Sequence, residues 1–173
     1  MDGGIVSDDT QMTMFTAEAL LKGPGDPITA LTRGYKDWYS TQYTNPPRGT
    51  ERLTGLLANP ELYALRAPGG TCLAAIRQGC NGRIENRIND SKGCGGIMRV
   101  APVGIMYKDP AQAALIGAQA AALTHGHDYG ILPAGVLACI ISILLNHPED
   151  VASRRVLAER IFEAVVICEE VFA

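Results

Sequence analysis

Four residues with oxygen-bearing side chains follow one another near the start of the chain: Ser7, Asp8, Asp9 and Thr10. One interpretation is a helix N-cap, because Ser and Asp accept bonds from the free N–H groups of a first turn and carboxylates favour the positive helix end. That interpretation does not explain two adjacent carboxylates, since like charges held close repel unless they point apart or share a cation. Carboxylate and hydroxyl oxygens suit hard ions such as Mg²⁺ or Mn²⁺. A helix cap and a metal site are therefore both open from the residues alone.

A second candidate is the segment NDSKGCGGIMR, residues 89–99, in which glycines between positions 93 and 96 leave the backbone unshielded. Backbone N–H groups at such a turn before a helix can hold a phosphate group. The spacing matches neither a Walker loop nor a dinucleotide-binding fingerprint, because no strand precedes it, so a plain flexible loop is the alternative. A role for Cys94 as a nucleophile has little support, because no His that could act as its base is close in sequence. Arg99 is expected either to bind an anion or to support the loop.

Two histidines, His125 and His127, stand in the third candidate, the segment LTHGHDYG. Side chains at positions i and i+2 project differently from a helix, so at most one of them faces a given site. The alternative is a C-terminal cap, with His near the negative end of a helix that Gly126 terminates.

Helical patterns dominate the segments between these candidates, and period-2 alternation is scarce. Asp-Pro pairs at 26–27 and 109–110 have the form of a capped helix start. We therefore expect an all-α domain with long loops, the longest over 79–96, and with helices over residues 9–21, 26–42, 60–79 (interrupted by Pro-Gly-Gly), 97–106, 109–127, 131–145 and 148–172.

The apolar faces of these helices predict the core. Helical spacing places three groups of side chains inward: Met12, Phe15 and Ala19; Ile28, Leu31, Tyr35 and Trp38; and Val156, Ile161, Val165 and Cys168. The segment 131–145 is almost wholly apolar, but a membrane span needs about 20 residues and this run contains Pro133, so we expect a buried core helix.

Composition narrows the class of protein. The chain has 173 residues with 47% hydrophobic and 19% charged, which suits one globular domain. The net charge is −3 without a long basic run, which argues against nucleic acid as a partner. Five cysteines without a CxxC pair predict neither a disulfide framework nor a zinc site, and the start of the chain has no secretion signal. We expect a cytoplasmic protein without a membrane partner.

In their order along the chain, these motifs resemble the ADP-ribosylglycohydrolase family, which includes the hydrolase that removes ADP-ribose from dinitrogen reductase. The resemblance rests on SDDTQMT (7–13), NDSKGCGGIMRVAPVG (89–104) and ALTHGH (122–127), with support from residues 59–76 and 131–145. It implies a compact multi-helix fold, a centre of two Mg²⁺ or Mn²⁺ ions, and hydrolysis of an N- or O-glycosidic bond at C1 of the ribose. The implied substrate is an ADP-ribosylated protein or a small molecule containing ADP-ribose.

The resemblance also implies roles for individual residues. Ser7, Asp8 and Asp9 would be metal ligands, and Asp8 and Asp9 would be catalytic. The diphosphate of ADP-ribose would lie on the glycine loop, residues 91–96, and His125 would lie beside the ADP-ribose site. The implied substrate-binding residues are Ser91, Lys92, Gly93, Cys94, Gly95, Gly96 and His125.

The chain departs from the family pattern at both ends. Family members have an earlier segment with an acidic residue near the metal and a late Asp-x-Asp-Thr motif, whereas after Asp128 this chain has only Asp150, with no Thr following it. We therefore expect residues 1–173 to form a single partial domain, truncated at both ends, with about half of the metal ligands and a large exposed apolar patch. The alternatives are a non-catalytic ADP-ribose-binding module and a structural protein that reuses the fold.

Overall fold

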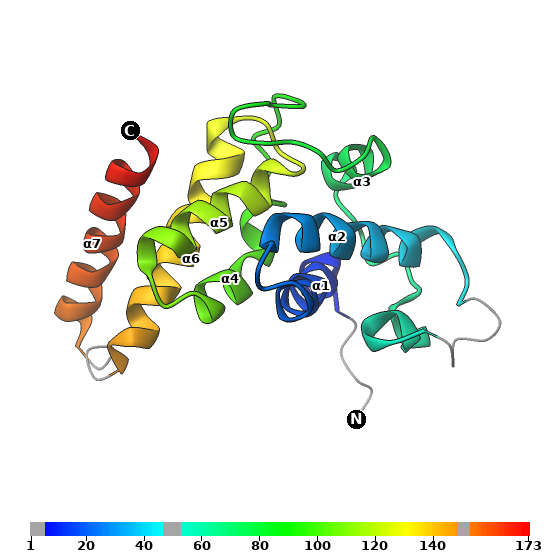
Figure 1. Ribbon diagram of the computed structural model, residues 1–173, viewed down its shortest axis with the longest axis horizontal. Helices are drawn as coiled ribbons and strands as arrows, with labels where there is room; N and C mark the ends of the chain where they lie inside the picture. Colours follow the sequence, from blue (N-terminus) through cyan, green and yellow to red (C-terminus); the bar gives the residue numbers. More distant parts are fainter. Residues whose placement is uncertain (1–5, 47–52, 149–152) are drawn as a thin grey trace.

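The computed structural model describes residues 6–46, 53–148 and 153–173, and no strand occurs among them. The predicted all-α fold is confirmed. In chain order the elements are α1 (Asp8–Lys22), α2 (Pro27–Tyr43), the 3₁₀ helices η2 (Gly55–Ala58) and η3 (Pro60–Leu62), α3 (Gly70–Arg77), the 3₁₀ helix η4 (Ile97–Arg99), α4 (Ala101–Met106), α5 (Pro110–Ala122), α6 (Asp128–Asn146) and α7 (Arg154–Phe172). Helix α7 lies at one edge of the molecule, and α3 lies toward the opposite edge (Figure 1).

Helices α1 and α2 pack together through the two predicted stripes. Met12, Phe15, Leu31, Tyr35 and Trp38 are fully buried. Helix α2 starts as predicted, because the Asp26 carboxylate accepts a hydrogen bond from the Thr29 N–H at 3.1 Å and Pro27 occupies the first turn.

A buried amide that the sequence patterns did not reveal joins α1 to its surroundings. The Gln11 amide oxygen accepts from Trp38 Nε1 at 3.2 Å and from Gln42 Nε2 at 3.1 Å. Its nitrogen donates to the carbonyls of Leu62 and Ala64 at 3.2 and 3.3 Å. All hydrogen-bonding capacity of this amide is used, as burial of a polar group requires.

Among the described helices, α5 and α6 share the most extensive contact. A Cβ on Gly117 would lie 2.8 Å from the Ala138 Cβ and 2.9 Å from the Ala134 carbonyl oxygen, so only glycine allows this approach. By length and composition α6 would be able to cross a membrane. In the structure it packs against α4, α5 and α7 and buries Ile131 and Ile143, which agrees with the predicted core helix.

Several predicted helix boundaries are wrong. Helix α5 ends at Ala122 rather than at residue 127, and α7 begins at Arg154 rather than at residue 148. Helix α6 begins at Asp128 rather than at residue 131, because His127 caps it through a side-chain bond from the Tyr129 N–H. The single helix expected over 97–106 is divided into η4 and α4. The reason is Pro102, which has no N–H to donate to the Met98 carbonyl; that carbonyl instead accepts from the Thr13 hydroxyl at 3.2 Å.

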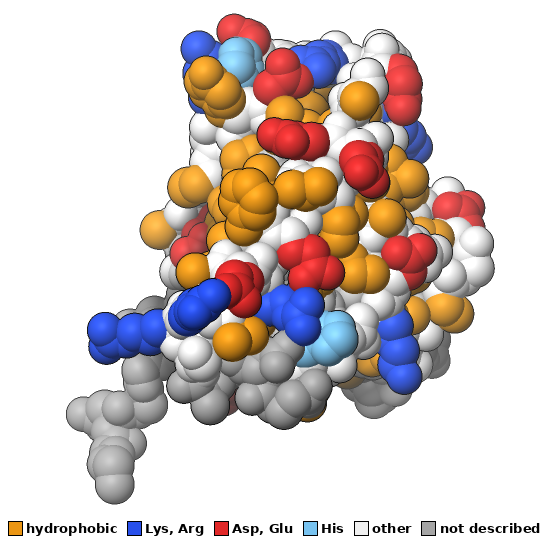
Figure 2. Space-filling view, turned by 90° about the vertical axis from the view of Figure 1, so that its left-hand side faces the viewer, with side chains coloured by type: hydrophobic (Ala, Val, Ile, Leu, Met, Phe, Trp, Pro, Cys, Tyr) orange, Lys and Arg blue, Asp and Glu red, His pale blue; other side chains and the backbone are white. Residues whose placement is uncertain are grey.

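Helix α7 packs along a narrower stripe than predicted. Ala164 and Cys168 are buried, whereas Ile161 and Val165, both expected inside, are 40% and 37% exposed. Ala164 and Cys168 form the buried centre of the contact with α6, where Cys139 Sγ lies 3.8 Å from the Ala164 carbonyl oxygen, and Ile167, Val171 and Phe172 pack beside them partly buried. Figure 2 shows this face of the molecule, with apolar side chains between acidic and basic ones. Residues 149–152 of the predicted helix, which include Asp150, lie outside the described residues.

Candidate functional site

The acidic cluster, which comprises Ser7, Asp8 and Asp9, lies at the start of α1. Ser7 occupies the N-cap position, but its side chain makes no capping bond. Its hydroxyl instead donates to the Asp9 carboxylate, with 3.0 Å between Oγ and Oδ2. The cap interpretation therefore holds in position but not in the side-chain bond: Ser7 is at the N-cap, and the two carboxylates of the first turn favour the positive end of the helix dipole.

The two adjacent carboxylates point apart, which relieves their repulsion. Asp8 is only 7% exposed, and its Oδ2 accepts a hydrogen bond from the Gly69 N–H at 3.1 Å. The Asp8 N–H also donates to the Arg66 carbonyl at 2.8 Å. Asp9, one position further along the helix, is exposed and meets the Ser7 hydroxyl. Asp8 is thus held by the segment before α3, and Asp9 faces solvent.

The start of α3 connects the acidic cluster to the glycine loop, residues 91–96. Gly69 contacts Asp8, and two residues later the Thr71 hydroxyl lies 3.1 Å from the Ser91 hydroxyl. A groove of about 400 Å³ runs beside this junction, lined by residues of α3 and of the segment 88–91. Residues 69–71 were absent from the predicted site, although the Pro-Gly-Gly break before a helix marks where such a junction forms.

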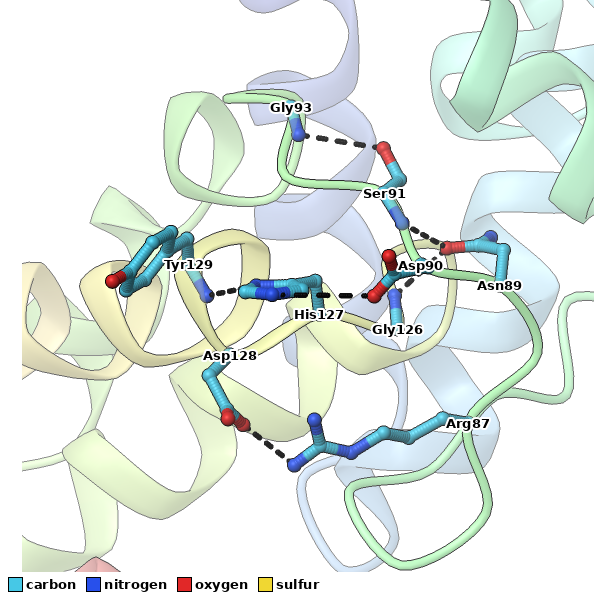
Figure 3. Close-up of polar contacts among 9 residues, drawn as sticks. All are labelled: Arg87, Asn89, Asp90, Ser91, Gly93, Gly126, His127, Asp128 and Tyr129. Carbon is cyan, nitrogen blue, oxygen red and sulfur yellow. Dashed lines mark hydrogen bonds and ion pairs between the residues drawn. The ribbon is translucent and has the colours of Figure 1, made fainter.

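The glycine loop presents its predicted residues at the surface in part. Lys92, Gly93 and Cys94 are exposed, whereas Gly96 is buried. The Gly93 N–H donates to the Ser91 hydroxyl at 3.3 Å, as Figure 3 shows. The helix expected directly after the loop is only the short 3₁₀ turn η4, so its dipole adds little to anion binding.

His125 lies beneath the glycine loop and is 1% exposed. A Cβ on Gly95 would come within 2.8 Å of Cys72 Sγ and 3.0 Å of His125 Cε1, and a Cβ on Gly93 would lie 3.4 Å from His125 Nε2. Close packing on the imidazole, rather than backbone flexibility, is therefore the reason for glycine at position 95. Burial, and secondarily the positive charge of Arg99, lower the pKa of His125 to about 4.

The amide of Asn89 joins the glycine loop to the turn that carries His125. Its Nδ2 donates to the Thr124 carbonyl at 2.8 Å, and its Oδ1 accepts from the Ser91 and Gly126 N–H groups at 3.0 and 2.9 Å. Figure 3 shows this side chain between the two segments. Asn89 was not among the predicted site residues, although an Asn two positions before a Ser in a polar loop is typical of such side-chain-to-backbone turns.

His127 has a structural position instead of facing the glycine loop. Its Nδ1 accepts from the Tyr129 N–H at 3.0 Å, and its Nε2 lies 4.0 Å from the Asp90 carboxylate (Figure 3). It therefore caps the start of α6 and does not form the C-terminal cap that the sequence left open as an alternative for these histidines. Only one of the two histidines faces the loop, as their spacing predicted.

Arg99 supports the site from inside the core. Its side chain is fully buried, with the guanidinium carbon 4.2 Å from the Tyr35 ring centroid. Nη2 donates to the Ala120 carbonyl at 2.9 Å and to the Thr124 hydroxyl at 2.7 Å. Of the two expectations for Arg99, support of the loop region agrees with this position, and binding of an anion does not.

The acidic cluster offers oxygen donors that fit a hard divalent ion in part. Ser7 Oγ and Asp9 Oδ2 are 3.0 Å apart. Adjacent ligands of an octahedral ion with bonds near 2.1 Å are separated by about 3 Å, so this pair has a suitable spacing. Asp8 already accepts a bond from Gly69, and in the described part of the chain no group of three or more His, Cys, Asp or Glu side chains is placed to hold a metal.

Comparison with known proteins identifies the family of the chain. Residues 2–171 match the model of the ADP-ribosylglycohydrolase family, a group of hydrolases that generally depend on a metal and act on substrates containing ADP-ribose. No curated protein and no solved structure matched the chain. The match covers nearly the whole sequence, and the acidic cluster, the glycine loop and His125 all fall within it. The chain belongs to the ADP-ribosylglycohydrolase family.

Proposed function

We propose that this protein takes part in hydrolysis of the glycosidic bond that links C1 of ADP-ribose to a protein side chain or a related acceptor. The observation that carries the proposal is the junction at the start of α3. The Gly69 N–H reaches Asp8, and Thr71 reaches Ser91. A ligand whose diphosphate lies on the glycine loop would therefore extend its ribose toward the acidic cluster.

The glycine loop and His125 would bind the diphosphate. Lys92 supplies a positive charge at the surface of the loop, and the exposed Gly93 offers backbone without a side chain beside it. Binding energy from this part of the ligand fixes the position of the reacting carbon. His125 contributes as a neutral group, because its pKa near 4 keeps it uncharged at physiological pH.

The acidic cluster would perform the chemistry. Ser7 and Asp9 would hold a Mg²⁺ or Mn²⁺ ion, and Asp8, fixed by its bond to Gly69, would complete this half of the centre. When bound, the ion orients ribose hydroxyls and lowers the pKa of a water molecule. Positive charge develops on the sugar ring as the glycosidic bond breaks, and the carboxylates of Asp8 and Asp9 stabilise it.

The free cysteines are compatible with a cytoplasmic setting.

Release of ADP-ribose from ADP-ribosylated arginine, measured with added Mg²⁺ or Mn²⁺, tests this proposal. Asp9→Asn is expected to abolish metal-dependent release. Asp90→Asn is the matched control, because Asp90 is an exposed carboxylate near the loop, 87% accessible, outside the acidic cluster. Equal loss in both variants, or release that does not depend on metal, would contradict the assigned roles.

A second function, binding of ADP-ribose without turnover, is favoured by one observation. Among the described residues, Asp8 and Asp9 turn to different partners, and no group of three or more His, Cys, Asp or Glu side chains is placed to hold a metal. Calorimetric titration with ADP-ribose in the presence and absence of Mg²⁺ separates the two functions. Binding independent of metal, with no release in the assay above, would support the binding module.

A further inference from the structure

A chain of hydrogen bonds runs from the core to His125. Arg99 Nη2 donates to the Thr124 hydroxyl oxygen at 2.7 Å, and this oxygen lies 2.8 Å from His125 Nδ1. The three side chains are 0%, 0% and 1% exposed, so water does not compete for these contacts.

The positions of the protons follow from the chemistry of the three groups. A guanidinium only donates, so the Thr124 oxygen is the acceptor of the Arg99 bond and keeps its own proton to give. That proton has two acceptors within reach, His125 Nδ1 at 2.8 Å and the Ala121 carbonyl at 3.4 Å. The nearer one is Nδ1, and the cation on the other side makes the hydroxyl a stronger donor. Nδ1 is then an acceptor, and a neutral imidazole must carry its proton on Nε2.

Burial and the charge of Arg99 together hold the imidazole of His125 neutral. Burial and the charge of Arg99 both disfavour imidazolium and lower the pKa of His125. A general acid or base for chemistry near neutral pH would need a pKa close to that pH. His125 is therefore suited to donate a fixed hydrogen bond and not to shuttle protons.

The Nε2 side of the ring faces the glycine loop. Cβ atoms built on Gly93 and Gly95 would lie 3.4 and 3.2 Å from Nε2, so this nitrogen lies against the loop backbone. Among the described residues Nε2 has no protein hydrogen-bond partner; the ring bonds through Nδ1 alone. This donor is therefore left unused by the described protein groups and lies directly beneath the loop.

Burial of the Arg99 guanidinium in the core is energetically unfavourable. None of its partners among the described residues is a carboxylate; they are the Tyr35 ring, the Ala120 carbonyl, the Thr124 hydroxyl and the sulfur atoms of Met12 and Cys72. Its Nε is buried without a partner. A buried cation without a counter-ion costs stability, and a requirement at the neighbouring site explains its presence.

We propose that Arg99 and Thr124 are positioning residues that fix His125 as the neutral Nε2–H tautomer, so that Nε2–H donates to an anionic group held by the glycine loop. The inference on the ligand rests on the proposed function, in which that group is a phosphate oxygen of ADP-ribose. The inference on the tautomer rests on the hydrogen bonds alone.

Long-range ¹H–¹⁵N correlation NMR of the ligand-free protein tests the tautomer directly, because protonated and unprotonated ring nitrogens have distinct shifts. The expected result is an unprotonated Nδ1 and a protonated Nε2 for His125 at pH 7. Thr124→Val should lose this pattern and Thr124→Ser should keep it. A protonated Nδ1 in the unaltered protein would overturn the proposal, and that measurement needs no variant to fold.

Calorimetric titration with ADP-ribose tests the donor. Loss of one hydrogen bond is expected to weaken binding about tenfold in Thr124→Val and to leave Thr124→Ser within about twofold of the parent. His125→Gln, which can place an N–H near Nε2, should bind better than His125→Asn. Equal affinity in all four variants and the parent would refute the donor role. No binding by the parent protein would refute the proposed function and the ligand inference with it, whereas the tautomer would still be decided by NMR.

Discussion

Protonation of His125 should make the stability of this protein fall between pH 6.5 and pH 4. The folded protein keeps the imidazole neutral down to about pH 4, because the ring is buried and Arg99 lies close, whereas the unfolded chain protonates it below the ordinary histidine pKa of 6.5. The unfolded state therefore binds more protons within this window, and the free energy of unfolding decreases as the pH falls. Above pH 6.5 both states hold a neutral ring and the contribution vanishes.

The magnitude follows from these two pKa values. One pKa unit corresponds to about 1.4 kcal/mol, so the full effect approaches about 3 kcal/mol below pH 4. Between pH 7.5 and pH 5 the loss is about 2 kcal/mol. This is a large part of the stability of a small domain, which is commonly about 5–15 kcal/mol.

Urea unfolding at pH 7.5, 6.5, 5.5 and 5.0 measures this loss, and comparison with His125→Gln isolates it from the carboxylates that titrate in the same range. The variant lacks the titrating group, so its stability should fall by about 2 kcal/mol less than that of the parent between pH 7.5 and pH 5. His127→Gln is the matched control, because it removes a histidine at the partly exposed start of α6 and leaves the buried imidazole of His125 in place, so the loss assigned to His125 should persist. If His125→Gln loses as much stability as the parent, the buried neutral imidazole is refuted.

Three further predictions concern packing and exposure. Gly95→Ala should destabilise the fold by about 1–3 kcal/mol, because its Cβ meets Cys72 Sγ at 2.8 Å, whereas chemical denaturation should show a change within about 0.5 kcal/mol for Gly93→Ala. Gln11→Leu should cost about 1–3 kcal/mol by leaving the Trp38 N–H buried without its acceptor, and a denaturation midpoint equal to that of the parent would contradict the network. In the native protein one of the five cysteines, Cys94, should react quickly with a thiol reagent, since the other four are buried; Cys94→Ser should remove that fast phase, and its persistence would contradict the burial of the others.

Local signals were sufficient for much of the fold. The Asp26-Pro27 and Asp109-Pro110 pairs cap their helices as their chemistry requires. Predicted helix boundaries were wrong where a single capping residue or proline set the end of a helix, because hydrophobic periodicity does not reveal such residues. His127 extends α6 by capping it, and Pro102 divides η4 from α4.

The prediction of the inward face of α7 was wrong for a different reason. Periodicity identifies which side chains share a stripe, but the width of the buried stripe depends on the partner helix. Contact with α6 through Ala164 and Cys168 leaves Ile161 and Val165 exposed. An apolar stripe on a helix therefore overstates burial when the neighbouring helices, here α5 and α6, cover only part of it.

The sequence by itself determined the helical class, the main core positions, the three motifs and their family, because these depend on residue types and short spacings. Only the tertiary structure decided how the motifs meet. Gly69 and Thr71 link the acidic cluster to the glycine loop, and Asn89 links that loop to His125. Arg99 reaches Thr124 across 25 residues of chain to orient the same histidine. Such contacts join segments far apart in sequence, and their geometry depends on how the helices pack.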